Sequence, residues 1–303
     1  MQIFSTARFV LPLPQGHRFP MEKYARLSER VARELGSRHP LREAPAAADS
    51  DLLRAHTPDW VGRVASGGLT REEIRRIGFP WSPEMVERSR RSAGATMAAC
   101  RAAAEDGIAV NLAGGTHHAF AGRGEGYCVF NDTAVAARAM QSEGRAHRVL
   151  VVDCDVHQGN GTAAIFRDDP SVFTFSIHGA KNFPFRKEVS DLDVELQDGT
   201  ADGEYLESLG AGMGEAASRF PSPDLALYIA GADPWEGDRL GRLKVSASGL
   251  AARDRRVLGF LRKAGIPVAV TMAGGYGRPI EGTVAIHFET VRIAAELAGA
   301  GPR

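Results

Sequence analysis

The side chains best suited to chemistry lie in one short stretch, residues 149–161, which reads Val-Leu-Val-Val-Asp-Cys-Asp-Val-His-Gln-Gly-Asn-Gly. Asp153, Asp155 and His157 occupy alternate positions at the end of an apolar run, so in an extended strand they point to the same face. A catalytic zinc takes carboxylate and imidazole ligands and keeps one position open for water. Asp155 and His157 therefore supply two candidate metal ligands.

Four further apolar runs end in uncommon polar groups. These are His117-His118 after 108–112, Ser176 in 172–177, Asp233 after 225–230 and Tyr276 after 268–272. The carboxyl ends of parallel strands meet at one edge of a sheet, so we expect these groups to converge. Asp233 then completes an Asp-His-Asp ligand set with Asp155 and His157.

This set of residue types predicts metal-assisted amide hydrolysis. A metal ion held by two carboxylates and an imidazole lowers the pKa of bound water from about 15.7 to roughly 7 and polarises a carbonyl. The His117-His118 pair suits acid and base roles, because an imidazole titrates near neutral pH. Tyr276 can donate a hydrogen bond to the oxyanion of a tetrahedral intermediate. No serine or cysteine nucleophile is required.

The strands that carry these groups alternate with helical patterns. The near-continuous apolar strands are typical of a parallel sheet covered on both faces. We expect a first strand within 2–10, a surface connection at 40–48, a loop over 179–203, and helices at about 20–35, 49–64 with a break at 57–58, 82–105, 131–142, 161–167, 204–219, 250–264 and 283–297. Thr70-x-x-Glu73 predicts a capping box before another short helix. The prediction is one α/β domain over residues 1–303, with three α/β/α layers and a mainly parallel sheet.

The composition excludes several classes of partner. Lys plus Arg equals Asp plus Glu, at 37 each, which gives no electrostatic footprint for nucleic acid or an anionic membrane. No apolar stretch approaches the roughly 20 residues of a membrane span, and residues 1–10 lack the features of a secretory signal. The three cysteines are odd in number and widely spaced, as in a reducing compartment. We expect a cytoplasmic protein, and the oligomeric state stays open.

Taken together, these motifs make the chain similar to the zinc-dependent histone deacetylases of the arginase/deacetylase superfamily. The matching signatures are Gly-Gly-Thr-His-His-Ala (114–119), Gly-Tyr-Cys-Val-Phe-Asn-Asp (126–132), Asp-Cys-Asp-Val-His-Gln-Gly-Asn-Gly (153–161), Gly-Ala-Asp-Pro-Trp-Glu-Gly-Asp-Arg-Leu-Gly (231–241) and Gly-Gly-Tyr (274–276). They stand in family order and span most of the chain. Segments 17–24 and 78–83 resemble the bacterial and class IV branch.

The resemblance assigns roles to individual residues. It implies zinc ligands at Asp155, His157 and Asp233, a general base at His118, its acid or electrostatic partner at His117, and a carbonyl-polarising Tyr276. It implies that Asp153 orients His117 and that a structural potassium ion is held by Asp153, Asp155, His157, Ser176 and Ile177. It places Gly126, Tyr127, Phe183, Gly274 and Gly275 at the substrate.

Asn160 departs from the family pattern, because many members carry an aspartate there to orient the second histidine. An amide oxygen still accepts a hydrogen bond from an imidazole, but it does not stabilise an imidazolium as a carboxylate does. We therefore expect His118 to be a weaker base here. The Gln158-Gly159-Asn160 sequence resembles class IV members, which indicates a subfamily mark and not an inactive site.

Three functions follow from these observations. The first is a zinc-dependent hydrolase that removes acetyl or longer acyl groups from lysine side chains of a peptide or protein. The second keeps the chemistry and takes a small N-acyl amine, such as an acetylpolyamine. The third is a catalytically silent protein that binds acyl-lysine. A ureohydrolase is disfavoured, because that related branch uses a paired-manganese site with additional aspartates.

The Ala-, Gly- and Arg-rich composition indicates a bacterial source, in which histones would not be the substrate.

The remaining histidines and arginine-rich patches are expected to have ordinary roles. His17, His39, His56, His147 and His287 are expected to be structural or exposed, and His178 to line the mouth of the site. The arginine-rich patches at 75–76, 88–91 and 253–256 are expected to be solvated helix faces.

Overall fold

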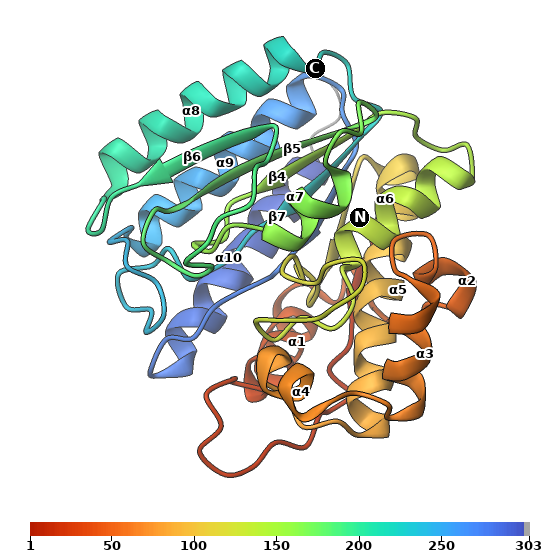
Figure 1. Ribbon diagram of the computed structural model, residues 1–303. Helices are drawn as coiled ribbons and strands as arrows, with labels where there is room; N and C mark the ends of the chain where they lie inside the picture. Colours follow the sequence, from red (N-terminus) through yellow and green to blue (C-terminus); the bar gives the residue numbers. More distant parts are fainter. Residues whose placement is uncertain (300–303) are drawn as a thin grey trace.

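The computed structural model describes residues 1–299, and its centre is one parallel sheet (Figure 1). Within those residues, eight strands stand in the order β2-β1-β3-β8-β7-β4-β5-β6, and every neighbouring pair is parallel. The strands are β1 (Ile3–Ser5), β2 (Leu41–Glu43), β3 (Ile108–Asn111), β4 (Val149–Asp153), β5 (Val172–Gly179), β6 (Leu192–Leu196), β7 (Leu225–Ile229) and β8 (Val268–Thr271).

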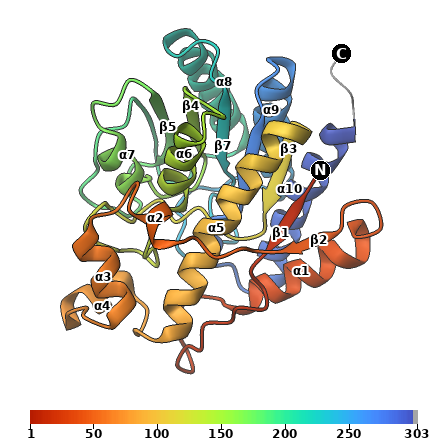
Figure 2. The ribbon, with the colours of Figure 1, turned by 90° about the vertical axis from the view of Figure 1, so that its right-hand side faces the viewer.

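Helices cover both faces of the sheet, so the fold has three layers. One face packs against α1 (Glu22–Leu35), α8 (Asp202–Arg219), α9 (Ala247–Lys263) and α10 (Ile280–Gly299). The other packs against α2 (Asp49–Leu52), α3 (Pro58–Ser66), α4 (Arg71–Ile77), α5 (Pro83–Asp106), α6 (Asp132–Ser142) and α7 (Asn160–Phe166). Figure 2, a quarter turn from Figure 1, shows α5 running along its face of the sheet.

Strand β4 explains why the apolar runs are continuous. Val149 and Val151 pack into the core beneath α5 and α6, whereas Leu150 and Val152 pack into the core beneath α8 and α9. A strand with helices on both sides needs apolar residues at odd and even positions alike. The expected α/β class, the three layers and the parallel sheet are confirmed.

Side-chain caps set several helix starts. Thr57 Oγ1 accepts from Trp60 N at the start of α3, which accounts for the break expected at 57–58. Thr70 and Glu73 form the expected capping box of α4. Each such cap stabilises a helix by about 1 kcal/mol.

The sequence pattern predicted neither of the two edge strands, β2 and β6. β2 lies within the segment 40–48 expected to be a connection, and β6 lies within the expected loop 179–203. Each pairs with one neighbour only, and both mix charged with apolar residues, so neither carries a continuous apolar run. The first strand also ends at Ser5 and not near residue 10, because the chain turns there and Phe9 N donates to Thr6 O.

No helix in the described range 1–299 has the length and apolar character needed to cross a bilayer. Cys100, Cys128 and Cys154 are all buried and unpaired, as expected.

Candidate active site

The two strand ends that carry the candidate ligands are neighbours in the sheet. Asp155 and His157 follow β4, Asp233 follows β7, and these strands pair directly. One ligand atom from each residue lies within 4.8 Å of the others. His157 Nδ1 is 2.9 Å from Asp155 Oδ1 and 3.1 Å from Asp233 Oδ2. Tetrahedral zinc with bonds of 2.0–2.1 Å separates its ligands by about 3.3 Å, so this spacing suits a zinc ion.

The hydrogen bonds around the carboxylates also fit a cation. Asp233 Oδ1 accepts from Val156 N and Asp155 Oδ2 accepts from Gly274 N, whereas Asp233 Oδ2 is buried and lies 3.1 Å from His157 Nδ1 without the geometry of a hydrogen bond. Burial and the nearby Asp155 charge raise the pKa of Asp233 to about 7. A buried carboxylate oxygen without a donor is costly unless a positive ion faces it. Imidazole nitrogen and carboxylate oxygen, the donors present here, are among the ligands that bind zinc in proteins.

Two glycines leave room for these carboxylates. A Cβ atom on Gly274 would lie 1.9 Å from Asp233 Oδ2, and one on Gly231 would lie 2.6 Å from Asp155 Oδ2. Any side chain at either position would displace a candidate ligand. Gly274 therefore lies directly against the candidate ligands. Neither Gly274 nor Gly275, which were predicted to contact substrate, is among the described residues that line the adjoining cavity.

The loop after β3 that carries the tandem histidines is held by the start of α6. Asp132 accepts hydrogen bonds from Gly115 N at 3.0 Å and Thr116 N at 2.6 Å. Asn131 caps the helix by accepting from Ala134 N, and its amide donates to Ala119 O. The Phe-Asn-Asp part of the 126–132 motif thus positions the histidine loop from behind.

The two histidines have different partners and different charges. His117 Nδ1 lies 2.6 Å from Asp153 Oδ2, and His118 Nδ1 lies 2.7 Å from Asn160 Oδ1. Burial opposes the charged form of His117, but Asp153 and Asp155 outweigh it and raise its pKa to about 9. Burial, together with His117 and His157, holds the pKa of His118 well below its usual value. Environments that push two pKa values apart are typical of an acid-base pair.

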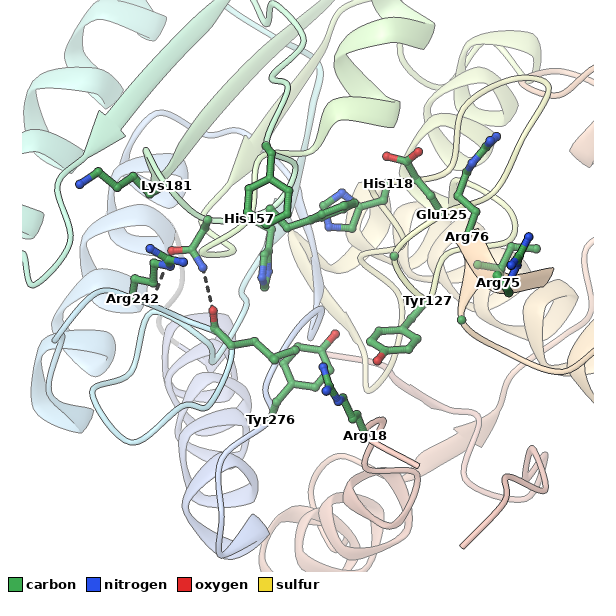
Figure 3. Close-up of a pocket in the computed structure, with 17 residues that line it drawn as sticks. Arg18, Arg75, Arg76, His118, Glu125, Tyr127, His157, Lys181, Arg242 and Tyr276 are labelled. Carbon is green, nitrogen blue, oxygen red and sulfur yellow. Dashed lines mark hydrogen bonds between the residues drawn. The ribbon is translucent and has the colours of Figure 1, made fainter. Parts of the chain in front are cut away.

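A cavity of about 590 Å³ opens above the ligand set (Figure 3). Its floor includes His118, His157 and Tyr276. Tyr276 follows β8, and its backbone N–H donates to Asp238 Oδ2 at 2.6 Å. Burial and the charges of Asp233 and Asp155 hold the phenol pKa well above its usual value, so Tyr276 is a hydrogen-bond donor at neutral pH.

The structure places three of the predicted substrate residues around this cavity, namely Gly126, Tyr127 and Phe183. The Phe183 ring meets the His118 ring edge-on, with centroids 4.9 Å apart. Gly126 has φ +57, and a Cβ there would lie 2.7 Å from His118 Cδ2. Glycine is thus required at 126 by both the backbone and the histidine.

The residues predicted to hold potassium lie at the adjoining ends of β4 and β5. Asp153 and Ser176 are partners in the register of the two strands, and Ile177 follows directly. Ser176 Oγ lies 2.9 Å from His178 Nδ1. The potassium ion stays a prediction. His178 is fully buried, so its expected place at the mouth was wrong.

The sequence did not predict the burial or the contacts of several charged residues. Lys23 is buried, and its Nζ donates to Ala273 O at 2.9 Å, beside Tyr276. Arg88 and Arg253, expected on solvated helix faces, are also buried. Arg88 donates to Phe9 O and Arg253 donates to Gly231 O, two carbonyls that lie far away in the sequence, so helical spacing carried no signal of their burial. Glu125 hydrogen-bonds to Asn160, thirty-five residues along the chain.

Known proteins share this sequence and fold. The histone deacetylase domain matches residues 17–290. An uncharacterised protein of Picosynechococcus sp. is 44% identical over 95% of this chain and 96% of its own length. The histone deacetylase-like amidohydrolase of Pseudomonas aeruginosa is 30% identical over 95% of this chain and 78% of its own length. The crystal structure of the HDA15 HD domain superposes with a TM-score of 0.82, covering 97% of this chain and 91% of that domain at 23% identity.

The chain therefore belongs to the histone deacetylase family, whose members are hydrolases of the arginase/deacetylase superfamily.

Proposed function

We propose that this protein is a zinc-dependent deacylase that removes acetyl or longer acyl groups from lysine side chains. One observation carries the proposal. Asp155, His157 and Asp233 form a compact ligand set at the floor of a cavity that also presents His118 and Tyr276. When bound, zinc supplies a Lewis acid that polarises the acyl carbonyl and makes a bound water acidic.

The remaining chemistry belongs to side chains of the chain itself. His118 is neutral, and its Nδ1 faces Asn160, so Nε2 is the nitrogen that takes the proton from the attacking water. Tyr276 donates a hydrogen bond to the carbonyl oxygen as negative charge develops there. His117 is held in its charged form by Asp153 and stabilises that charge. The proton on His118 then passes to the leaving amine, which completes hydrolysis to a carboxylate and a free lysine.

The test combines metal content with turnover on one preparation. We expect about one equivalent of zinc and chelator-sensitive cleavage of acetyl-, longer acyl- or trifluoroacetyl-lysine peptides, with acetylpolyamines as the alternative substrates. Asp233→Ala removes a ligand and should lose both zinc and turnover. Gly259→Ala, on a helix position with nothing within 4 Å of the new methyl group, is the matched control. Zinc binding without cleavage of any substrate would favour the silent acyl-lysine-binding alternative.

A further inference from the structure

The mouth of the cavity carries an excess of positive charge. Five of its lining residues are exposed cations, namely Arg18, Arg75, Arg76, Lys181 and Arg242. Among the described lining residues the single carboxylate is Glu125, and it is engaged with Asn160. The chain as a whole has zero formal charge, so this excess is local.

Three of these cations have no carboxylate partner among the residues that the structure describes. Arg76 pairs with Glu72 at 2.8 Å and Arg242 with Asp198 at 3.3 Å. Within residues 1–299, no carboxylate lies within 4.0 Å of a charged nitrogen of Arg18, Arg75 or Lys181. Unpaired cations around a concave opening attract anions and repel cations before contact is made.

The cations lie on more than one side of the opening. Figure 3 shows Arg75 and Arg76 on one side, Lys181 and Arg242 on the opposite side, and Arg18 beside Tyr276. A ligand that meets both sides must cross the mouth, as an extended peptide does and a small molecule does not. Phe185, with 85% of its surface exposed, also lines the cavity and offers an apolar contact.

We propose that the substrate is an acyl-lysine within an acidic polypeptide segment, with aspartate or glutamate on both sides of the modified lysine. This inference rests on the proposed function and names its substrate class. The acyl-lysine enters the cavity, and the flanking carboxylates meet the mouth cations. Acetylpolyamines carry additional ammonium groups and meet the same cations with repulsion, as do lysine-rich peptides.

The experiment compares two peptides that carry the same acyl-lysine, one with Asp and Glu flanks and one with Lys and Arg flanks. We expect kcat/KM about tenfold higher for the acidic peptide at low salt, mostly through KM, with the difference shrinking in 0.5 M NaCl because exposed charges are screened. Replacing Arg75 and Lys181 together by glutamate should reverse the preference. Arg71→Glu, on the same helix α4 but outside the cavity lining, should leave it unchanged.

Fluorescence anisotropy measures the affinity for the same peptides without turnover. It therefore tests the preference for acidic peptides separately from the proposed deacylase activity. Absence of turnover with either peptide contradicts the proposed deacylase, while tighter binding of the acidic peptide would still support the charge selection. Equal affinities and equal rates for the two peptides overturn it. If the free amino acid Nε-acyl-lysine, which carries one carboxylate, is cleaved faster than the acidic peptide, the proposal that the substrate is a polypeptide is wrong.

A separate observation concerns the Asn160 amide that faces His118. Asn160 Oδ1 faces His118 Nδ1 at 2.7 Å, and Asn160 Nδ2 donates to Glu125 Oε1 at 2.6 Å. The Glu125 side chain is 14% exposed, and its second oxygen lies 3.7 Å from Arg123. The Glu125 carboxylate is thus connected to the candidate base, His118, through the Asn160 amide.

Glu125 decides which way the Asn160 amide points. A carboxylate only accepts hydrogen bonds, so it must face the Asn160 NH₂ group, and the Asn160 oxygen must then face His118. An oxygen at that place accepts from Nδ1–H and leaves Nε2 unprotonated, which is the tautomer that a base toward the cavity requires. The same contact polarises the amide and increases the negative charge on its oxygen.

We infer that Glu125 is a positioning residue that sets the tautomer of His118 through Asn160. Glu125→Gln can donate to Asn160 Oδ1 and let the amide turn over, which presents NH₂ to His118. We expect kcat to fall by about 10²-fold with KM nearly unchanged, in line with the loss of a general base. Glu188→Gln is the matched control, because that carboxylate pairs with Arg167.

A double-variant cycle separates this role from a structural one. In Asn160→Asp, two carboxylates face each other, so adding Glu125→Gln replaces repulsion by a hydrogen bond and should raise kcat. Glu125→Gln therefore lowers kcat when Asn160 is present and raises kcat in the Asn160→Asp background. A fall of equal size in both backgrounds, or a change confined to KM, would overturn the inference.

Discussion

The contacts of Arg253 determine how much stability the protein should lose when this residue is replaced. Its side chain is fully buried, and both Nε and Nη2 lie 2.9 Å from Asp254 Oδ1. Its Nη1 donates to Gly231 O at 2.5 Å and approaches Cys154 O at 3.4 Å. Gly231 stands two residues before Asp233, and Cys154 directly precedes Asp155. One guanidinium thus ties the backbones of both ligand-bearing strand ends together from behind.

We expect Arg253→Met to be strongly destabilising although methionine is an unbranched side chain that can follow the path of the arginine stem. Among residues 1–299, the side-chain donors left to Asp254 would be the neutral groups Tyr228 Oη and Thr290 Oγ1. Leaving a buried charge unpaired costs about 3–5 kcal/mol, and a buried carbonyl without a donor costs about 1–3 kcal/mol. Because the two costs overlap, we expect the free energy of unfolding to fall by about 4–6 kcal/mol, a large part of the roughly 5–15 kcal/mol of a whole domain. Zinc affinity should fall as well.

Urea unfolding followed by circular dichroism measures the loss, and a second variant tests its cause. Adding Asp254→Asn to Arg253→Met removes the uncompensated charge while keeping a group that can bond to Tyr228 and Thr290. We expect the double variant to recover about 2 kcal/mol or more, since buried charges cost far more than buried amides. Equal stabilities of the single and double variants would refute the ion-pair argument.

Three further outcomes test other parts of the site and core. Gly274→Ala should weaken zinc binding at least about tenfold without unfolding the protein, because the new methyl group meets Asp233 Oδ2 at 1.9 Å; unchanged zinc content by metal analysis, with Gly259→Ala as reference, would contradict it. Tyr276→Phe should cut turnover about 10²-fold with zinc still bound, in line with loss of one oxyanion donor; wild-type turnover would remove Tyr276 from its role. Burial lowers the pKa of His56 from 6.5 to about 4, and its Nε2 accepts from Asn131 N. The folded state then binds fewer protons than the unfolded chain between those values, so its stability falls as pH drops below 6.5, by about 2 kcal/mol at pH 5. His56→Gln keeps an acceptor and should lose that part of the slope between pH 7 and pH 5; an unchanged slope would show that other groups cause it.

The central part of the fold could be predicted because each inner strand carries its own signal. Val149 to Val152 are apolar on both faces, and the polar residues that follow mark where the strand reaches the open edge. The edge strands β2 and β6 could not be predicted in the same way. Each has a single partner, and residues 192–196 alternate apolar with acidic side chains, which is the pattern of a half-buried strand and not the continuous apolar run by which the inner strands were identified.

In the candidate site, too, residues that are close in sequence could be predicted, whereas contacts between distant residues could not. Asp155 and His157 are local in sequence, and their pattern alone predicts a metal site. Contacts such as Glu125 with Asn160 or Arg253 with the Gly231 carbonyl join residues that only the tertiary fold brings together. A carboxylate or guanidinium in a charged segment has the same local pattern whether it is solvated or buried, so the sequence carries no signal for these partners.

The position of β8 in the sheet has a consequence for biosynthesis. β8 comes last in sequence among the described strands, yet it lies between β3 and β7, near the middle of the sheet. A nascent chain that has reached residue 267 can form β2-β1-β3 and β7-β4-β5-β6 only as two separate pieces, each with an unpaired edge open to other chains. The histidine loop belongs to the first piece and the ligand set to the second. The sheet that joins the histidine loop to the candidate ligands is therefore completed only after β8 has been made, and a chain interrupted before residue 268 lacks the strand that closes the gap between β3 and β7.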